Sequence, residues 1–248
     1  MTNQYLKIDF HIHTREDTDN VIDYTAFDLI DRAASLDFDA ISITNHDVQI
    51  YGNKLKSYAE KKDLILFPGM ERSINHKHVL LINFSDRQLF NTYNEIQLAK
   101  TEENLVIAPH PFFPGMQSLG QDMYQHPELF DAVEFCHFYC PQFNFNREAI
   151  RFSKKYHLPL VAGSDAHVQE QFGRCYSLVK SEKNQFAIIQ AIKAGDVQVV
   201  SSPLQLSQMI IIYLKILSQK PSLKRALMRV RGIGNRLRQV SEIRQYLK

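Results

Sequence analysis

Short apolar runs alternate with amphipathic stretches over most of the chain. The apolar runs have the length of buried strands, and the stretches between them repeat apolar residues at helical spacing. In the segment Tyr24–Leu36, for example, Phe27, Ile30 and Ala33 share one face. Strands that alternate with helices are typical of βαβ units around a parallel sheet. The expected strands are Tyr5–Phe10, Asp39–Thr44, Leu64–Pro68, Val79–Phe84, Leu105–Ala108, Ala132–Phe135, Leu160–Ala162 and Val197–Val200, and the expected helices are Tyr24–Leu36, Leu89–Thr101, Arg147–His157 and Gln185–Ala194.

This alternation favours a closed barrel over an open sheet, and 248 residues are enough for one α/β barrel. After Pro203 the pattern changes, because the rest of the chain is typical of helices alone, interrupted near Pro221 and at Arg231–Gly234. The sequence therefore predicts a barrel over residues 1–202 and a basic helical C-terminal extension over residues 203–248.

Charge is divided unevenly between these two parts. The chain has a net charge of +2, whereas residues 203–248 hold ten Lys and Arg against one acid, Glu242, for +9, which leaves −7 on the rest. An acidic body with a basic tail indicates two surfaces. Three interpretations of the tail stay open: packing on the acidic body, contact with acidic lipid head groups, and binding of nucleic acid. Gly232–Gly234 resembles the turn of helix-hairpin-helix DNA binders.

Apolar run length, the N-terminal residues and the cysteine count bear on the cellular compartment of the protein. No apolar run approaches eighteen residues, so we expect no transmembrane segment. The N-terminal residues are polar and lead directly into a strand, so we expect no signal peptide. The three cysteines match neither a zinc ribbon nor an even disulfide set. A reduced, cytoplasmic setting is the expectation.

Histidines and acids follow the predicted strands. His11 and His13 close the first strand, and alternate residues of an extended chain point to the same side. The carboxyl ends of parallel barrel strands form one rim, where active sites assemble. His78 is the exception because it begins its strand, and either a sheet that turned antiparallel there or a distorted barrel would return it to that rim. The residues that follow other strands are His46, Glu71, His110, Asp165 and His167.

Six histidines and two acids beside successive strands predict a metal site. Ligation by His, Asp and Glu without Cys favours zinc, manganese or iron, and carboxylates with water also admit magnesium. A shared carboxylate such as Glu71 could bridge two ions. We therefore expect two or three divalent metal ions.

The ordered motifs resemble the polymerase and histidinol phosphatase (PHP) superfamily of phosphoesterases. Four motifs over about residues 5–180 carry the resemblance: His11-Ile-His13, Thr44-Asn45-His46-Asp47, Pro109-His110-Pro111 and Gly163-Ser-Asp165-Ala-His167. Glu71 and His78 fall where the family has a bridging Glu and a further His. The resemblance implies a distorted seven-stranded (β/α) barrel, similar to a TIM barrel, with three metals.

It also implies a ligand set for each metal. The first metal would be held by His11, His13, Glu71 and Asp165. The second would share Glu71 and take His78 and His110. The third would use His46, His167 and an acid after His13, for which Asp17 is our choice, with Asp19 and Glu16 as alternatives.

Two departures from the family pattern affect the third metal. Asn45 stands where the family commonly has Asp, and Thr14–Asn20 replaces a Ser-Asp-Gly that often follows the first motif.

The expected activity is hydrolysis of a phosphate ester by a metal-activated water. The substrate would be a small phosphomonoester, a nucleotide or a nucleic acid end. Asp165, His167 and Arg174 are the candidate catalytic residues, and the proton for the leaving group could come from His167, from His137 or from a metal-bound water. Arg174 is the preferred phosphate-binding cation because the family often carries Gly-Arg near this point. Weaker candidates are Arg15 and Arg72 for phosphate, Glu134 and His137 for the pocket wall, and His76 as a ligand.

Two other functions compete with this hypothesis. An amidohydrolase-like enzyme would cleave C–N bonds, but that class usually needs a carboxylated Lys or a different order of histidines. A catalytically weak PHP barrel would only bind phosphorylated ligands, and Asn45 is its one support.

Overall fold

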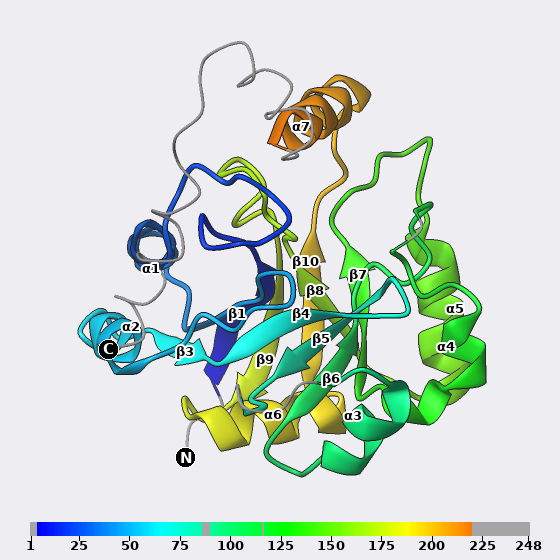
Figure 1. Cartoon of the computed structure of the whole chain (residues 1–248), viewed down its shortest axis with the longest axis horizontal. Helices are drawn as coiled ribbons and strands as arrows, with labels where there is room; N and C mark the ends of the chain where they lie inside the picture. Colours follow the sequence, from blue (N-terminus) through cyan, green and yellow to red (C-terminus); the bar gives the residue numbers. More distant parts are fainter. Residues whose placement is uncertain (1–3, 86–89, 116, 220–248) are drawn as a thin grey trace.

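The structure is a computed structural model that describes residues 4–85, 90–115 and 117–219. Two five-stranded sheets form its centre (Figure 1). The first has the order β10 (Val197–Ser201), β9 (Cys175–Ser181), β1 (Gln4–Ile12), β2 (Ala40–Ile43) and β3 (Ile65–Phe67). The second has the order β4 (Gly69–Ile74), β5 (Lys77–Ile82), β6 (Leu105–Ala108), β7 (Ala132–Cys136) and β8 (Leu160–Gly163).

The expected mixed α/β fold is confirmed, but the closed seven-stranded barrel is not. The strands of the described residues pair in two separate ladders, and β9 and β5 each run antiparallel to both neighbours. Pro68, which has no N–H to donate, separates β3 from β4 at the point where the chain passes between sheets. At the site end the sheets are joined by two isolated bridges, His46 with Glu71 and Ile12 with Ala166. Continuous strand pairing between the two sheets is absent among the described residues, so the barrel is not closed.

Strand β4 was not predicted, and its hairpin with β5 provides the antiparallel turn that the position of His78 required. Asn75 and His76 both have positive φ, as a two-residue hairpin turn requires, and β5 runs antiparallel to β4 and β6. His78, at the start of β5, thereby returns to the rim that the other histidines share. His76 lies exposed at the turn, away from that rim.

The helices cover the outside of the sheets, and one lies over the rim. In Figure 1, α1 and α2 lie on one side of the sheets, α3 to α6 lie below and on the other side, and α7 lies above the strand ends. The helix bounds are α1 Ala26–Ser35, α2 Asn53–Glu60, α3 Tyr93–Ala99, α4 Asp122–Gln125, the 3-10 helix η1 Pro127–Leu129, α5 Asn146–Tyr156, α6 Gln185–Ala194 and α7 Leu206–Gln219.

The space between the sheets is filled by apolar side chains. Leu6 and Ile8 of β1, Leu80 of β5 and Ile107 of β6 belong to one buried cluster, which Ile188 of α6 also joins. Burial of such side chains is the main force that holds the two sheets together. The functional rim lies above this core, so its polar side chains are held on a packed base.

The predicted C-terminal extension is described only in part. Its first helical segment is α7, and residues 220–248, with most of the basic positions and Gly232–Gly234, lie outside the described residues. Its separation from the body at residue 202 stays a prediction. Among the described helices, none has the length and apolar character needed to span a bilayer.

Gly163 provides a test of how the two sheets meet. A Cβ at this position would lie 2.6 Å from His11 Cβ and 2.5 Å from Glu134 Oε1. We expect Gly163→Ala to lower the free energy of unfolding by about 1–3 kcal/mol, because β8 would have to move away from β1 and the Glu134 side chain would have to shift. Chemical denaturation measures the loss.

Gly115→Ala is the matched control, because a Cβ there meets nothing within 4 Å. An unchanged stability for Gly163→Ala would contradict this close packing.

Candidate metal centre

Glu71 lies at the centre of the rim, with its side chain 1% exposed. Its Oε1 is 2.7 Å from His78 Nδ1 and 3.2 Å from His110 Nε2. Its Oε2 is 3.1 Å from His46 Nε2 and 3.3 Å from His13 Nε2. One buried carboxylate thus faces imidazoles on both oxygens, as a bridging ligand would.

Asp165 closes this arrangement from the other side. It follows β8 with a φ of 43°, and its Oδ1 lies 3.3 Å from both His11 Nε2 and His13 Nε2. Ligand atoms about 2.0–2.2 Å from one ion lie roughly 3.0–3.5 Å apart at tetrahedral or octahedral angles. The separations around Asp165 and Glu71 therefore suit shared divalent ions.

Carboxylates behind the histidines fix which ring nitrogen faces inward. Glu134 Oε1 lies 2.9 Å from His11 Nδ1, and Asp17 Oδ2 lies 2.9 Å from His13 Nδ1 and 2.8 Å from His46 Nδ1. With an ion at Nε2, each Nδ1 would carry the proton and donate it to its carboxylate, the usual arrangement for metal-binding histidines. Among the described residues, the buried Nε2 atoms of His11 and His13 have no hydrogen-bond partner.

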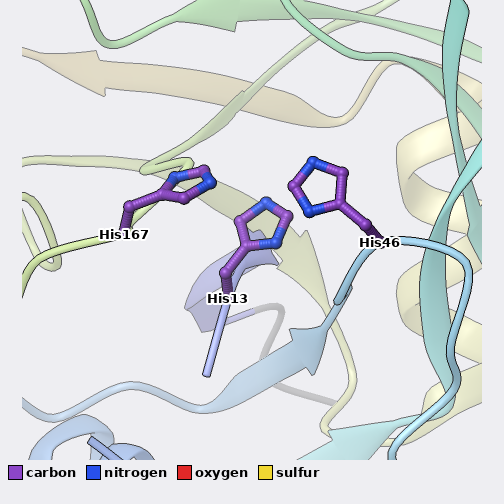
Figure 2. Close-up of side chains that lie close together, drawn as sticks. All are labelled: His13, His46 and His167. Atoms are coloured by element: carbon purple, nitrogen blue, oxygen red, sulfur yellow. The ribbon is translucent and has the colours of Figure 1, made fainter. Parts of the chain in front are cut away.

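Eight of the nine predicted metal ligands meet in four groups. His13, His46 and His167 form one of them, and their rings lie together in Figure 2, with His13 stacked on both others. The other groups are His11 with Glu71 and His110, His11 with His13 and Asp165, and His46 with Glu71 and His78.

Asp17 is the predicted ligand that lies outside these groups. Its Oδ2 already accepts from both rings and from the His46 amide, and its Oδ1 accepts from the amides of Asp19 and Asn20. Asp17 therefore holds rings in place, and its role as a ligand stays a prediction. Of the two alternatives, Asp19 lines the cavity. Glu16 does not, and it points toward the start of α1, 3.5 Å from the Ala26 amide.

Asn45 also lies behind the ligands rather than among them. Its Oδ1 accepts from the Thr14 amide at 2.8 Å, and its Nδ2 donates to the Thr14 hydroxyl at 2.9 Å. The departure at this position thus changes how the loop after His13 is fixed, and it removes no member of the four groups.

The electrostatics of the centre favour added positive charge. Burial alone would lower the pKa of His11, but Glu134, Asp165 and Glu71 raise it well above its usual value. Burial alone would raise the pKa of Glu71, but His78 and His11 lower it well below the usual range. Buried carboxylates that need cationic neighbours are suited to divalent ions, which would replace the protons on these rings.

A cavity of about 580 Å³ opens over the ligands. No Arg or Lys is among its described lining residues. Arg174, the predicted phosphate-binding cation, is exposed and donates to the Glu170 carbonyl. Arg72 pairs with Asp47, and Arg15 donates to the Asp23 carbonyl. Among the described residues, the cavity lining therefore offers no Arg or Lys to an anionic ligand.

Gln171 and His137 form a hydrogen-bonded pair in the cavity wall. The sequence analysis proposed His137 for this wall but did not identify Gln171. Its Oε1 accepts from the amides of His167 and Val168, so its Nε2 must donate to His137 Nε2 at 2.8 Å. The proton of the His137 ring is therefore on Nδ1, which is buried without a partner among the described residues. Only tertiary contacts distinguish this Gln from other polar loop residues.

Comparison with known proteins gives one family match and several shared folds. Residues 143–197 match the model of the PHP-associated family. PsfC from Pseudomonas syringae PB-5123 has a TM-score of 0.62 at 15% identity, over 87% of this chain and 99% of that one. A candidate metal-dependent phosphoesterase from Bifidobacterium adolescentis ATCC 15703 has a TM-score of 0.53 at 14% identity, over 65% of this chain and 88% of that one.

The lesion-specific endonuclease PfuEndoQ from Pyrococcus furiosus has a TM-score of 0.52 at 18% identity, over 79% of this chain and 57% of that one. Among curated proteins there is no significant match. The matched segment and the shared fold confirm the resemblance to the PHP superfamily.

Glu71→Gln tests the bridging position. A neutral amide cannot balance the charge of two ions, so we expect at least one bound ion fewer per chain after loading with manganese. Elemental analysis by mass spectrometry measures the metal content. Glu148→Gln, on the exposed side of α5, is the control and should keep the wild-type content. Equal metal content in both variants would contradict a bridging Glu71.

Proposed function

We propose that this protein is a metal-dependent hydrolase of phosphate esters. The observation that carries the proposal is the buried Glu71 carboxylate between inward-facing imidazoles, with Asp165 opposite. Two or three divalent ions, of manganese, iron, zinc or magnesium, would occupy the four groups. When bound, such ions lower the pKa of water and neutralise charge on phosphoryl oxygens.

The residues of the chain would keep the centre in one arrangement during turnover. Glu134 and Asp17 hold the rings of His11, His13 and His46, so their Nε2 atoms need no reorientation when a substrate enters. The surrounding strand ends exclude water from the buried side of the centre. Preorganised groups of this kind lower the cost of charge rearrangement in the transition state.

His137 would act as a neutral hydrogen-bond donor. Burial lowers the pKa of its ring to about 4, so the ring is uncharged at neutral pH. Gln171 holds its Nε2, its Nδ1–H is buried without a partner among the described residues, and the residue lines the cavity. A neutral ring that gave up this proton would become an anion, so we propose that His137 binds an ester oxygen and is not the acid for the leaving group.

The two competing functions are less well supported. The weak phospholigand-binding barrel rested on Asn45, which contacts the Thr14 loop and not the ligand groups. A C–N hydrolase has no specific observation in its favour. The substrate would be a small phosphomonoester, a nucleotide or a nucleic acid end, and the PfuEndoQ fold keeps the last of these open.

Asp165→Ala is the first test of the reaction. The substitution removes the carboxylate that lies between His11 and His13. Because a metal ion supplies several kcal/mol of transition-state stabilisation, we expect kcat to fall by about 100-fold or more. Release of p-nitrophenol from a phosphomonoester and a phosphodiester, with and without manganese, measures activity. Asp31→Ala on the exposed face of α1 is the control. Full activity of Asp165→Ala would refute the proposal.

His137→Phe tests the donor separately from the metals. Phe keeps an aromatic ring at this position but loses Nδ1–H, together with the Nε2 acceptor of Gln171, and removal of one donor to a developing oxyanion typically lowers kcat by about 100-fold. Metal content should stay at the wild-type value, because His137 is in none of the four groups. His126→Phe, at the surface, is the control. Wild-type kcat for His137→Phe would exclude this role.

A further inference from the structure

The cavity has two chemically different halves. One half is the metal centre, and the other is apolar and lies beneath and beside α7. The apolar half is lined by Phe113, Phe138, Tyr213, Ile216 and Leu217. Phe113 and Phe138 pack edge to face, with ring centroids 5.9 Å apart.

Helix α7 is fixed over the cavity by contacts at both ends. Leu204, just before the helix, and Ile212, in its middle, are buried in a cluster with Phe138. At its end, the Gln219 side chain donates to the His167 carbonyl at 3.1 Å, and the Gln219 carbonyl accepts from the Val21 amide at 3.0 Å. The helix is therefore tied to the loop that carries His167, and its apolar residues form one wall of the cavity.

The charge of the cavity selects against substrates with several anionic groups. The described lining residues include Asp19 but no Arg or Lys, so a second phosphate would meet no cation outside the metal centre. Apolar side chains instead offer favourable burial to an uncharged group. The part of the ester that is not phosphate must fit this half.

We propose that the apolar half binds an uncharged, aromatic-sized organic group of a phosphate monoester, with Leu217 and Tyr213 of α7 as specificity-determining contacts. This rests on the proposed function, because the phosphate is taken to lie at the metal centre. The first helix of the predicted C-terminal extension thus lines the cavity. The sequence analysis had instead assigned the basic extension to a surface separate from the barrel.

Benzyl phosphate and ethyl phosphate separate this proposal from the chemistry. Both release an unactivated primary alcohol, so they differ mainly in the group that enters the apolar half. We expect the manganese-loaded wild type to prefer benzyl phosphate in kcat/KM by about ten-fold or more. Leu217→Ala should lower kcat/KM for benzyl phosphate by about ten-fold and leave ethyl phosphate within two-fold.

Leu214→Ala is the matched control, because Leu214 is on the same helix, is 58% exposed and does not line the cavity. It should leave both substrates unchanged. Equal losses for the two esters in Leu217→Ala, or no preference in the wild type, would overturn the proposal.

A binding experiment keeps the inference separate from the activity. Calorimetric titration of the manganese-loaded protein with benzylphosphonate and ethylphosphonate needs no turnover. Tighter binding of benzylphosphonate, reduced about ten-fold in Leu217→Ala, would support the apolar half even if neither ester is hydrolysed, in which case the proposed function alone fails. Equal binding of the two phosphonates by the wild type would overturn the inference whatever the activity.

Discussion

The carboxylate of Glu71 is the group on which the arrangement of the site depends. An ionised carboxylate that is almost fully buried is costly unless opposite charge surrounds it. In this protein the surrounding groups are imidazoles, whose inward nitrogens are suited to hold divalent cations rather than protons. The need to balance this buried charge explains why so many strand ends direct a histidine to one point.

The same constraint connects the site to the fold. His11 on β1 pairs with Glu134 on β7, so the ladder of one sheet supplies the ligand and the other supplies its orienting carboxylate. Gly163 on β8 allows this approach, because a larger residue would collide with both. The two sheets can therefore keep separate strand pairings and still build one centre, since isolated backbone bridges and these side chains connect them at the rim.

Beyond the metal centre, the cavity is shaped by residues that follow the last strand. Helix α7 contributes apolar side chains to the cavity, and the described lining residues include no Arg or Lys. Under the proposed function, binding of phosphate would therefore depend on the ions, and recognition of the organic group would depend on packing. This division of roles is common in ligand pockets, where a few polar groups fix orientation and apolar surface supplies affinity. Nucleic acid binding by the basic residues after position 219 is a separate hypothesis.

The sequence by itself determined the alternation of strands and helices, the family resemblance and the set of candidate ligand residues, because each depends on local spacing along the chain. It could not determine the sheet ladders, since β4 and β9 bury polar and small residues such as Glu71 and Ser177 and lack a clear apolar pattern. Only the tertiary structure decided that Asp17 orients rings, that Gln171 sets the His137 tautomer and that Arg174 lies outside the cavity. The physical reason is that such roles depend on contacts such as that between His11 and Glu134, 123 positions apart, which local patterns do not encode.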